Sequence, residues 1–219
     1  MQVFIGYDQR QPVAFQVLAH SIWKRASKPV TITRLDIRQL PIERQGLTEF
    51  TYSRYLVPWL CGFHGKALFL DADMLCLADV AELFDMEVNS PVSVVKSENR
   101  FEWPSMMLFN NPLCRYAFGH GLNTPDFSFI EEGKPQNFEW AGGADNVGKL
   151  PPEWNHIVPY DGENPDAKII HYTQGIPCFP ETEGCEWGEA WRQEAQDAMS
   201  TVSWEAIMGK SVHKQAMGL

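Results

Sequence analysis

Short apolar runs alternate with segments of helical periodicity at the start of the chain. Residues 3–7 form an apolar run that leads into polar residues, which predicts a strand followed by a turn. Pro12 suits the first turn of a helix, and apolar residues then recur at helical spacing as far as Arg25. Residues 31–35 are rich in β-branched side chains and predict a second strand. The pattern therefore predicts a strand–helix–strand unit.

The next segments continue this alternation. Residues 67–70 are continuously apolar and end at Asp71, which predicts a strand buried on both faces. Residues 91–96 and 106–109 predict further strands, and residues 51–60 predict a helix that its internal proline must bend or stop. Strands that alternate with helices are typical of an α/β fold with a largely parallel sheet. In such a sheet, ligands bind at the carboxyl ends of the strands.

The composition and periodicity of the sequence change after about residue 122. From there to about residue 165, proline, glycine, asparagine and aromatic residues crowd together without a long periodic segment, which predicts a loop-rich cap. Residues 168–172 predict a further strand, and residues 186–199 predict a terminal helix. We expect a single domain over residues 1–219. Its expected parts are a ligand-binding region over about 1–122, the cap with its strand over about 123–185, and a helical tail over 186–219.

Composition and charge narrow the classes of function. Of the 219 residues, 44% are hydrophobic and 21% are charged, so the chain can bury a substantial core. The formal net charge of −10 argues against a general nucleic-acid or acidic-membrane binder, because both need clustered lysine and arginine. It does not exclude a phosphorylated ligand, since a bound metal ion supplies positive charge. No apolar run approaches the length of a membrane span.

The cysteines and the N-terminal residues indicate the compartment. Five cysteines are scattered along the chain without a CxxC pair. The first residues have the pattern of a strand rather than that of a signal peptide. An odd number of cysteines without such a signal predicts reduced thiols and a cytoplasmic location. A disulfide between Cys178 and Cys185 is the less favoured alternative.

The leading chemical signal is the pair Asp71 and Asp73, which are separated by one residue directly after the predicted buried strand. Two carboxylates placed in this way can turn toward one hard cation that keeps open positions for phosphate oxygens. Pairs of this spacing also occur by chance in turns, so the position after a strand is what gives this one its value. The pair predicts a metal site that serves a nucleoside diphosphate.

His171 is the candidate for a third ligand. A histidine near the end of a strand is more often a hydrogen-bonded structural residue than a metal ligand. Beside a pair of aspartates that lacks a third protein ligand, it becomes the natural candidate. An imidazole among carboxylates suits Mn²⁺ better than Mg²⁺. The predicted metal ligands are therefore Asp71, Asp73 and His171, with Mn²⁺ or Mg²⁺ as the ion.

Five segments occur in the order and spacing of a known protein family. They are Phe4-Ile5-Gly6-Tyr7-Asp8, Tyr52-Ser53-Arg54-Tyr55-Leu56-Val57-Pro58, Phe69-Leu70-Asp71-Ala72-Asp73, Leu150-Pro151-Pro152-Glu153-Trp154-Asn155 and His171-Tyr172. Together they resemble a glycosyltransferase of the retaining family 8 type, the group of glycogenin and the lipopolysaccharide galactosyltransferases. The likeness covers most of the chain. It implies a GT-A fold, with a central, mostly parallel sheet and a loop-rich acceptor cap.

The resemblance also implies an activity and roles for single residues. The expected reaction moves a hexose from a nucleotide diphosphate sugar, expected to be UDP-linked, to an acceptor hydroxyl with retention. Tyr7 and Asp8 would contact the base or ribose, and Arg54 would lie near the diphosphate or the sugar. Asp71 and Asp73 would contact both the metal and the donor. The expected partners are this sugar nucleotide and a glycan, lipid-glycan or protein acceptor.

One departure from the family concerns the leaving group. After the metal histidine, the family has a Gly-x-x-Lys-Pro-Trp segment whose lysine supports the departing diphosphate. This chain reads Gly175-Ile176-Pro177-Cys178-Phe179 there, without a lysine. Arg10, Arg54 or Lys168 would have to take its place. For Arg54, the alternative is a surface salt bridge on a helix.

A second departure concerns the donor sugar. The Asp-Gln-Asp segment that faces the sugar in the family has no clear counterpart in this chain. Asp145 is the expected catalytic substitute, and Glu139 and Asp126 are the alternatives. An acidic residue in such a loop is more often a plain loop carboxylate than a catalytic one.

Two other functions stay open on the sequence alone. Haloacid-dehalogenase-type phosphatases also place two aspartates after a strand, but normally after the first strand of the chain. A non-catalytic protein that binds sugar nucleotides or carbohydrates would fit the missing lysine. A metal-dependent glycosyltransferase fits the ordered segments better than either alternative.

Overall fold

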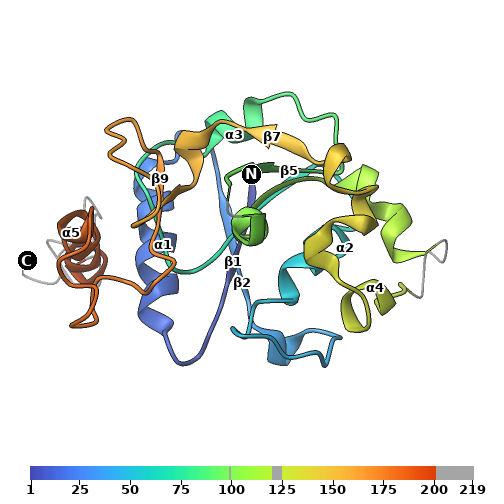
Figure 1. Ribbon diagram of the computed structural model, residues 1–219, viewed down its shortest axis with the longest axis horizontal. Coiled ribbons are helices and arrows are strands. Elements are labelled where there is room, and N and C mark those ends of the chain that lie inside the picture. The colour runs from blue at the N-terminus through green and yellow to red at the C-terminus, as the bar shows by residue number, and fades with distance from the viewer. Residues whose placement is uncertain (99, 120–124, 201–219) are drawn as a thin grey trace, which may run out of the picture.

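The computed structural model describes residues 1–98, 100–119 and 125–200. Within this part of the chain, a six-stranded sheet of order β2-β1-β3-β6-β5-β7 forms the centre of the molecule (Figure 1). Strand β6 is antiparallel to both of its neighbours, and the other adjacent pairs are parallel. The predicted α/β fold with a mostly parallel sheet is confirmed. The strands are β1 (Gln2–Gly6), β2 (Thr31–Leu35), β3 (Lys66–Leu70), β5 (Val92–Val95), β6 (Met106–Asn110) and β7 (Gly148–Leu150).

Strand β3 lies in the middle of this sheet. Its last four residues, 67–70, are completely buried, which explains why they form an unbroken apolar run. Burial of a side chain the size of Leu68 or Phe69 contributes about 2 kcal/mol. The strand is therefore a rigid support for Asp71, the residue that follows it.

Helix α1 (Pro12–Arg25) connects β1 to β2. It begins with Pro12 in its first turn, where a missing backbone N–H costs nothing. Its apolar stripe, which includes Val17, Leu18 and Ile22, is buried. The predicted strand–helix–strand unit is confirmed.

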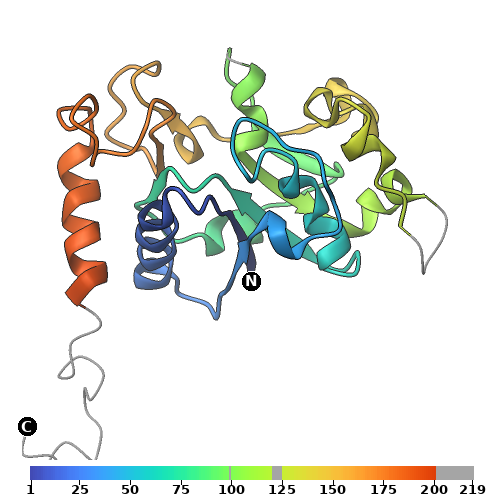
Figure 2. The ribbon, with the colours of Figure 1, turned by 90° about the horizontal axis from the view of Figure 1, so that it is seen from below.

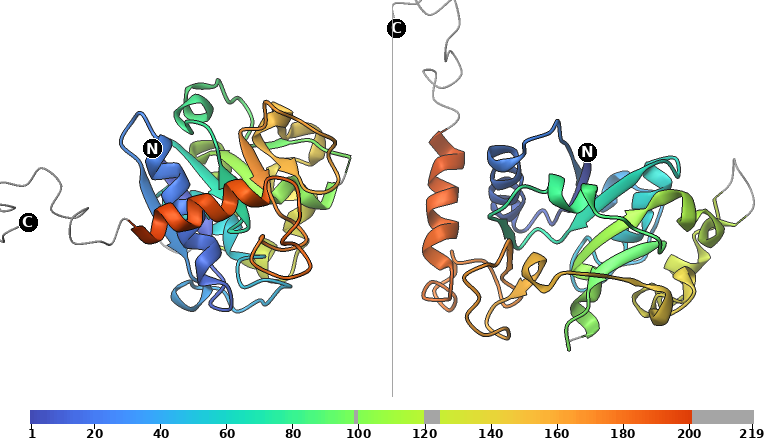
Figure 3. Two further views of the ribbon diagram at one scale, coloured as in Figure 1. Left: turned by 90° about the vertical axis from the view of Figure 1, so that its left-hand side faces the viewer. Right: turned by 90° about the horizontal axis from the view of Figure 1, so that it is seen from above.

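The C-terminal helix α5 (Gly188–Ser200) lies against α1 at one end of the molecule (Figures 2 and 3). Glu194 holds it there, with a side chain that is only 3% exposed. Its carboxylate lies 2.9 Å from Nη1 of Arg25 and also contacts the ring of His20. The predicted terminal helix is confirmed. The rest of the predicted helical tail, 201–219, lies outside the described residues.

A second, smaller sheet has the order β4-β9-β8. It consists of β4 (Met74–Cys76), β9 (Ile169–His171) and β8 (His156–Ile157). Strand β9 is antiparallel to β4 and parallel to β8. The strand expected at 168–172 is confirmed, whereas β4, β7 and β8 were not predicted. Strands of two or three residues are too short to show a period of two in the sequence.

The segment 51–60 differs from the single bent helix that its sequence predicts. It forms a 3₁₀ turn, η2 (Ser53–Leu56), followed directly by a short α-helix, α2 (Val57–Leu60). Pro58 lies in the first turn of α2, so it begins a helix rather than ending one. All four residues of η2 are buried, and Arg54 is among them.

Most of the expected cap consists of short helical turns, as predicted for a loop-rich segment. The division of the chain into three parts stays a prediction. The remaining elements are α3 (Ala81–Asp85), α4 (Ser128–Glu131), η1 (Ile37–Gln39), η3 (Arg100–Ser105), η4 (Asn111–Phe118), η5 (Pro135–Asn137), η6 (Glu139–Ala141), η7 (Ala144–Asn146) and η8 (Pro152–Trp154).

Two further observations concern the whole described chain. All five cysteines lie within it, and each is a free thiol, so the alternative of a disulfide between Cys178 and Cys185 is not supported. Over the residues that the structure describes, no helix has both the length and the apolar character needed to cross a membrane.

Candidate metal and donor site

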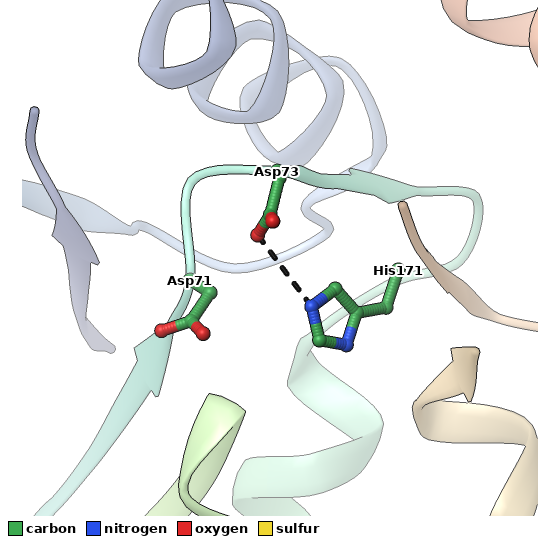
Figure 4. Close-up of side chains that lie close together, drawn as sticks. All are labelled: Asp71, Asp73 and His171. Atoms are coloured by element: carbon green, nitrogen blue, oxygen red, sulfur yellow. Dashed lines mark ion pairs between the residues drawn. The ribbon is translucent and has the colours of Figure 1, made fainter. Parts of the chain in front are cut away.

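Asp71 and Asp73 lie on the turn between the two sheets. Strand β3 ends at Leu70, and the backbone N–H of Asp71 donates a hydrogen bond to the carbonyl of Ser105 (2.8 Å). The chain then turns and enters β4 at Met74. Figure 4 shows the two carboxylates directed from this turn toward the same space. The predicted placement directly after a buried strand is confirmed.

His171 reaches the two aspartates through the pairing of β4 with β9. Met74 pairs with His171 in this ladder, and the N–H of Tyr172 donates to the carbonyl of Asp73 (2.9 Å). Nε2 of His171 lies 3.5 Å from Oδ1 of Asp73 (Figure 4). One ligand atom from each of the three side chains falls within 4.8 Å of the others. The structure thus brings the three predicted ligands together.

The chemistry of these three groups fits a divalent cation. Oδ1 of Asp73 and Nδ1 of His171 are buried and have no hydrogen-bond partner among the described residues. Buried polar atoms normally have one, so the cluster has unused capacity for a ligand. Two carboxylates and an imidazole are donors that Mn²⁺ accepts readily and Mg²⁺ accepts in part. The set is therefore suitable for the expected metal.

The ionisation of the cluster supports the same conclusion. Burial above all, opposed by Arg54 and assisted by the negative charge of Asp73, raises the pKa of Asp71 to about 7. Burial acts to lower the pKa of His171, but the carboxylates around it, Asp73 above all, outweigh burial, so the pKa is raised. Like charges held together at low exposure favour the binding of a positive ion.

Arg54 is buried within the site and does not form a surface salt bridge. Its Nη2 lies 2.9 Å from Oδ1 of Asp71. Nη1 donates to the carbonyl of Pro104 (2.7 Å) and Nε to that of Phe50 (3.3 Å). The guanidinium is therefore fixed between η2, η3 and the end of β3. Its expected contact with the diphosphate or sugar stays a prediction.

Tyr7, Asp8 and Arg10 follow strand β1 at the same edge of the sheet. β1 pairs with β3 so that Ile5 lies opposite Leu70, and the residues after both strands leave the sheet side by side. Asp8 is 5% exposed and accepts hydrogen bonds from the backbone N–H and from Nε of Arg10, both at 2.9 Å. The Arg10 side chain holds the pKa of Asp8 below its usual value. Asp8 and Asp71 thus both follow strands that end at the same edge of the sheet.

Comparison with known proteins decides the family. The sequence profile described as glycosyl transferase family 8 matches residues 7–126, more than half of the chain. The chain is also 31% identical over 231 residues to Protein CDI of Arabidopsis thaliana, with 90% of this chain and 86% of the relative covered. The chain belongs to glycosyl transferase family 8. The predicted resemblance and the expectation of a glycosyltransferase are confirmed, and the phosphatase alternative is wrong.

Solved structures agree with this family 8 assignment at the level of the GT-A fold. The galactosyltransferase LgtC, in complex with donor and acceptor sugar analogues, matches with a TM-score of 0.62 and 13% identity, over 90% of this chain and 96% of LgtC. GlyE of Streptococcus pneumoniae TIGR4 matches with a TM-score of 0.62 and 16% identity, over 98% of this chain and 64% of GlyE. The bifunctional glycosyltransferase WbbM gives a TM-score of 0.66 and 16% identity, over 94% of this chain. The chain spans 50% of the length of WbbM.

The three candidates for the sugar-facing carboxylate of this family 8 chain are not part of the metal cluster. Asp145, on η7, and Glu139, on η6, are both exposed. Asp126 is exposed as well, and its carboxylate accepts the backbone N–H of Ser128. Within the described part of the chain, no hydrogen bond or ion pair connects any of these three to the cluster. A catalytic role for Asp145 stays a prediction.

Lys168, a third candidate for the role of the missing lysine, has other partners in this structure. Its Nζ forms an ion pair with Glu82, and it also lies 4.9 Å from the centre of the Trp154 ring. It precedes β9 at the end opposite to His171. Arg10 and Arg54 remain as the candidates for the role of the missing lysine.

Sequence reasoning missed one buried acid of this family 8 site, Glu102. It is 5% exposed and lies on η3, just before β6. One of its carboxylate oxygens accepts a hydrogen bond from the hydroxyl of Thr173 (2.6 Å), and the other lies 3.9 Å from Nδ1 of His171. Glu102 belongs to no spaced motif, and only the fold brings it to His171.

Proposed function

We propose that this family 8 glycosyltransferase moves a hexose from a UDP-linked sugar to an acceptor hydroxyl in a reaction that depends on Mn²⁺ or Mg²⁺. One observation carries the proposal. The carboxylates of Asp71 and Asp73 and the ring of His171 converge, with unused ligand capacity, at the sheet edge where Asp8 also lies. The carboxyl edge of an α/β sheet is where such folds bind nucleotides.

In this proposal, different residues of the site bind the nucleoside and the diphosphate of the donor. Tyr7 and Asp8 would hold the base or ribose, since Asp8 stays ionised beside Arg10 and can accept hydrogen bonds. A bound Mn²⁺ or Mg²⁺ would offset the negative charge of the diphosphate as it leaves. Arg10 is exposed beside Asp8 and can turn toward a phosphate oxygen.

Retention at the anomeric carbon is part of the proposal. It rests on the resemblance of the ordered segments to retaining family 8 enzymes. The acceptor hydroxyl would form the new C–O bond as the bond to the diphosphate breaks, and its proton would pass to the departing phosphate oxygen. No side chain is assigned as a nucleophile, because Asp145, Glu139 and Asp126 lie exposed on the cap.

We assign the acceptor to a pocket of about 520 Å³. It opens between the end of β5 and the segment that contains β8, and β8 pairs with the His171 strand, Ile157 opposite His171. The hydroxyl of Tyr160 in this pocket accepts a hydrogen bond from Gln174 (3.1 Å). Its polar lining suits a hydroxyl-rich acceptor such as a glycan, and includes Lys96, Glu98, His156, Tyr160, Asp161 and Asn164.

The test is an assay of nucleoside diphosphate release. The purified protein is incubated with a panel of nucleotide sugars and Mn²⁺, with and without a chelator, alone and with simple sugar acceptors. Asp73→Ala and His171→Ala are assayed in parallel. The matched control is Asp85→Ala, an exposed aspartate on α3 that pairs with Lys28. Anomeric configuration of the product is read by NMR.

The proposal predicts release from uridine-linked donors that is lost with chelator and in both site variants but kept in the control. Calorimetry with UDP-sugar and Mn²⁺ follows if no donor is turned over. Binding that needs Mn²⁺ without turnover would favour a non-catalytic binder, which the missing lysine suggests. If the protein shows neither turnover nor binding of any UDP-sugar, the proposed donor and metal are wrong.

A further inference from the structure

We propose that Glu102 is a positioning residue for His171. Its carboxylate accepts the hydrogen bond of His171 Nδ1–H and thereby directs Nε2 toward the cation. The inference rests on the proposed metal-dependent function, which it deepens by adding a residue outside the metal ligands. No sequence motif points to Glu102, and the geometry around three side chains carries the argument.

The first observation is the unused nitrogen of His171. The side chain is 2% exposed, and Nε2 is the atom that faces Asp73, at 3.5 Å. Nδ1 on the other side of the ring is buried and has no hydrogen-bond partner among the described residues. A neutral imidazole that binds a metal through Nε2 must carry its proton on Nδ1, and that proton needs an acceptor.

The second observation is that Glu102 lies on this side of the ring. Its Oε2 is 3.9 Å from Nδ1 of His171, slightly beyond hydrogen-bond distance. The proposal requires this separation to shorten by several tenths of an ångström when the cation binds. Metal-bound histidines commonly donate their second N–H to a carboxylate, which fixes the tautomer and raises the basicity of the ligand nitrogen.

The third observation is that Glu102 is itself held in place. Its Oε1 accepts the hydroxyl of Thr173, two residues after His171, at 2.6 Å. Its backbone carbonyl accepts the hydroxyl of Ser105 (2.6 Å), which in turn accepts Nδ2 of Asn155 (3.0 Å). These contacts leave Oε2 as the oxygen directed to the imidazole.

The charge of the site also fits this assignment. A side chain only 7% exposed is an expensive place for a carboxylate without compensation. With Asp71 and Asp73, Glu102 forms a group of three acids, and Arg54 forms an ion pair with one of them. A divalent cation bound by Asp71, Asp73 and His171 would supply positive charge beside this group of acids.

A direct metal ligand is the alternative role for Glu102. Its oxygens are not among the donor atoms that lie within 4.8 Å of one another. A carboxylate behind the ring, rather than beside Nε2, is in the position of a residue that acts through the histidine.

The test compares Glu102→Gln, Glu102→Ala and Thr173→Val with wild type and with Glu87→Ala, an exposed glutamate as control. Mn²⁺ affinity is measured by calorimetry on each full-length protein. Separately, ¹⁵N NMR of the metal-free proteins reports which ring nitrogen of His171 carries the proton, at a pH where the ¹⁵N shifts themselves show a neutral ring. Circular dichroism checks that each variant is folded.

We expect Glu102→Ala to weaken Mn²⁺ binding by about 10- to 100-fold and to lose the Nδ1–H form of His171. Glu102→Gln keeps an oxygen acceptor and should restore the Nδ1–H form with a smaller loss of affinity. Thr173→Val should cause a milder shift in the same direction, and it serves as the test if Glu102→Ala fails to fold. Glu87→Ala should match wild type.

An unchanged tautomer and an unchanged affinity in Glu102→Ala would overturn the inference. A failure of the metal site itself looks different, because wild type would then bind no Mn²⁺. The tautomer comparison still decides the role of Glu102 in that case, since it uses metal-free protein. If Glu102→Ala weakens Mn²⁺ binding but leaves the tautomer unchanged, Glu102 acts by charge alone and the positioning role is wrong.

Discussion

Arg54 and Asp71 form a buried ion pair, with Nη2 of the arginine 2.9 Å from Oδ1 of the aspartate. The two residues come from different elements, η2 and the end of β3, and both side chains are about nine-tenths buried. The guanidinium also donates to two backbone carbonyls. Arg54 therefore anchors the first predicted metal ligand to the body of the protein.

Because of this pair, we expect removal of the Arg54 side chain to lower the free energy of unfolding considerably. Arg54→Met leaves Asp71 buried without its positive partner, and loss of one member of a buried pair costs about 3–5 kcal/mol. The free energy of unfolding is measured by urea denaturation in the absence of metal. Lys28→Met is the control, since it breaks an exposed pair with Asp85 and should cost less than about 1 kcal/mol. Equal costs for the two variants would contradict the structural role of Arg54.

We expect Asp73 to be needed for metal binding but not for the stability of the metal-free protein. Mn²⁺ at a hundred times its dissociation constant should stabilise wild type by about 2.7 kcal/mol, and a chelator should reverse the effect. Asp73→Asn should lose this response. Without metal it should be at least as stable as wild type, because the negative charge of Asp73 acts against ionised Asp71. Thermal melts with and without Mn²⁺ measure both effects, and Asp85→Asn should keep the full Mn²⁺ response.

We expect the difference in stability between wild type and Asp36→Asn to depend on pH. It is buried at the start of η1, and a hydrogen bond from the Arg38 side chain holds its pKa below the usual value. A lowered pKa in the folded state contributes stability above the unfolded value of about 3.9, and this contribution is lost as the pH falls through the folded pKa. Asp36→Asn should therefore be less stable than wild type at neutral pH, and the gap should close in acid. Urea titrations across this range measure it, and a gap that stays constant would contradict the linkage.

Because Glu194 links α5 to α1, we expect its removal to loosen α5 from the rest of the protein. Its carboxylate is buried against Arg25 and His20, so Glu194→Ala should destabilise this contact by about 1–3 kcal/mol. Hydrogen exchange should show faster exchange in α5 while the β3 amides keep their protection. Glu189→Ala, on the exposed face of the same helix, is the control and should leave exchange in α5 nearly unchanged. Uniform loss of protection would show that α5 does not open as a separate unit.

The parts of the fold that follow from sequence are those with strong local signals. β3 is an unbroken apolar run because both of its faces are covered, and Asp71 follows it directly. The antiparallel direction of β6 leaves no such trace, since its residues are buried in the same way as those of a parallel strand. Local pattern shows burial, whereas strand direction depends on the path of the connections.

The same distinction separates the residues of the site. Asp71 and Asp73 are neighbours in sequence, so their common role is visible before the fold is known. His171 could be named from the sequence only by assuming that the aspartates have a third partner ligand. The pairing of β9 with β4 brings His171 to them. Glu102 reaches His171 only through tertiary structure, from a turn among aromatic residues with no spacing that would indicate it.

The pairing of β4 with β9 has a consequence for how the protein is made. The two strands are distant in sequence, so their ladder closes a long loop, which carries an entropic cost. A chain emerging from the ribosome exposes both aspartates long before the histidine strand is synthesised. The cluster that we propose as a metal site is therefore complete only once His171 has been translated, so a metal ion would bind all three side chains after most of the described chain has been made.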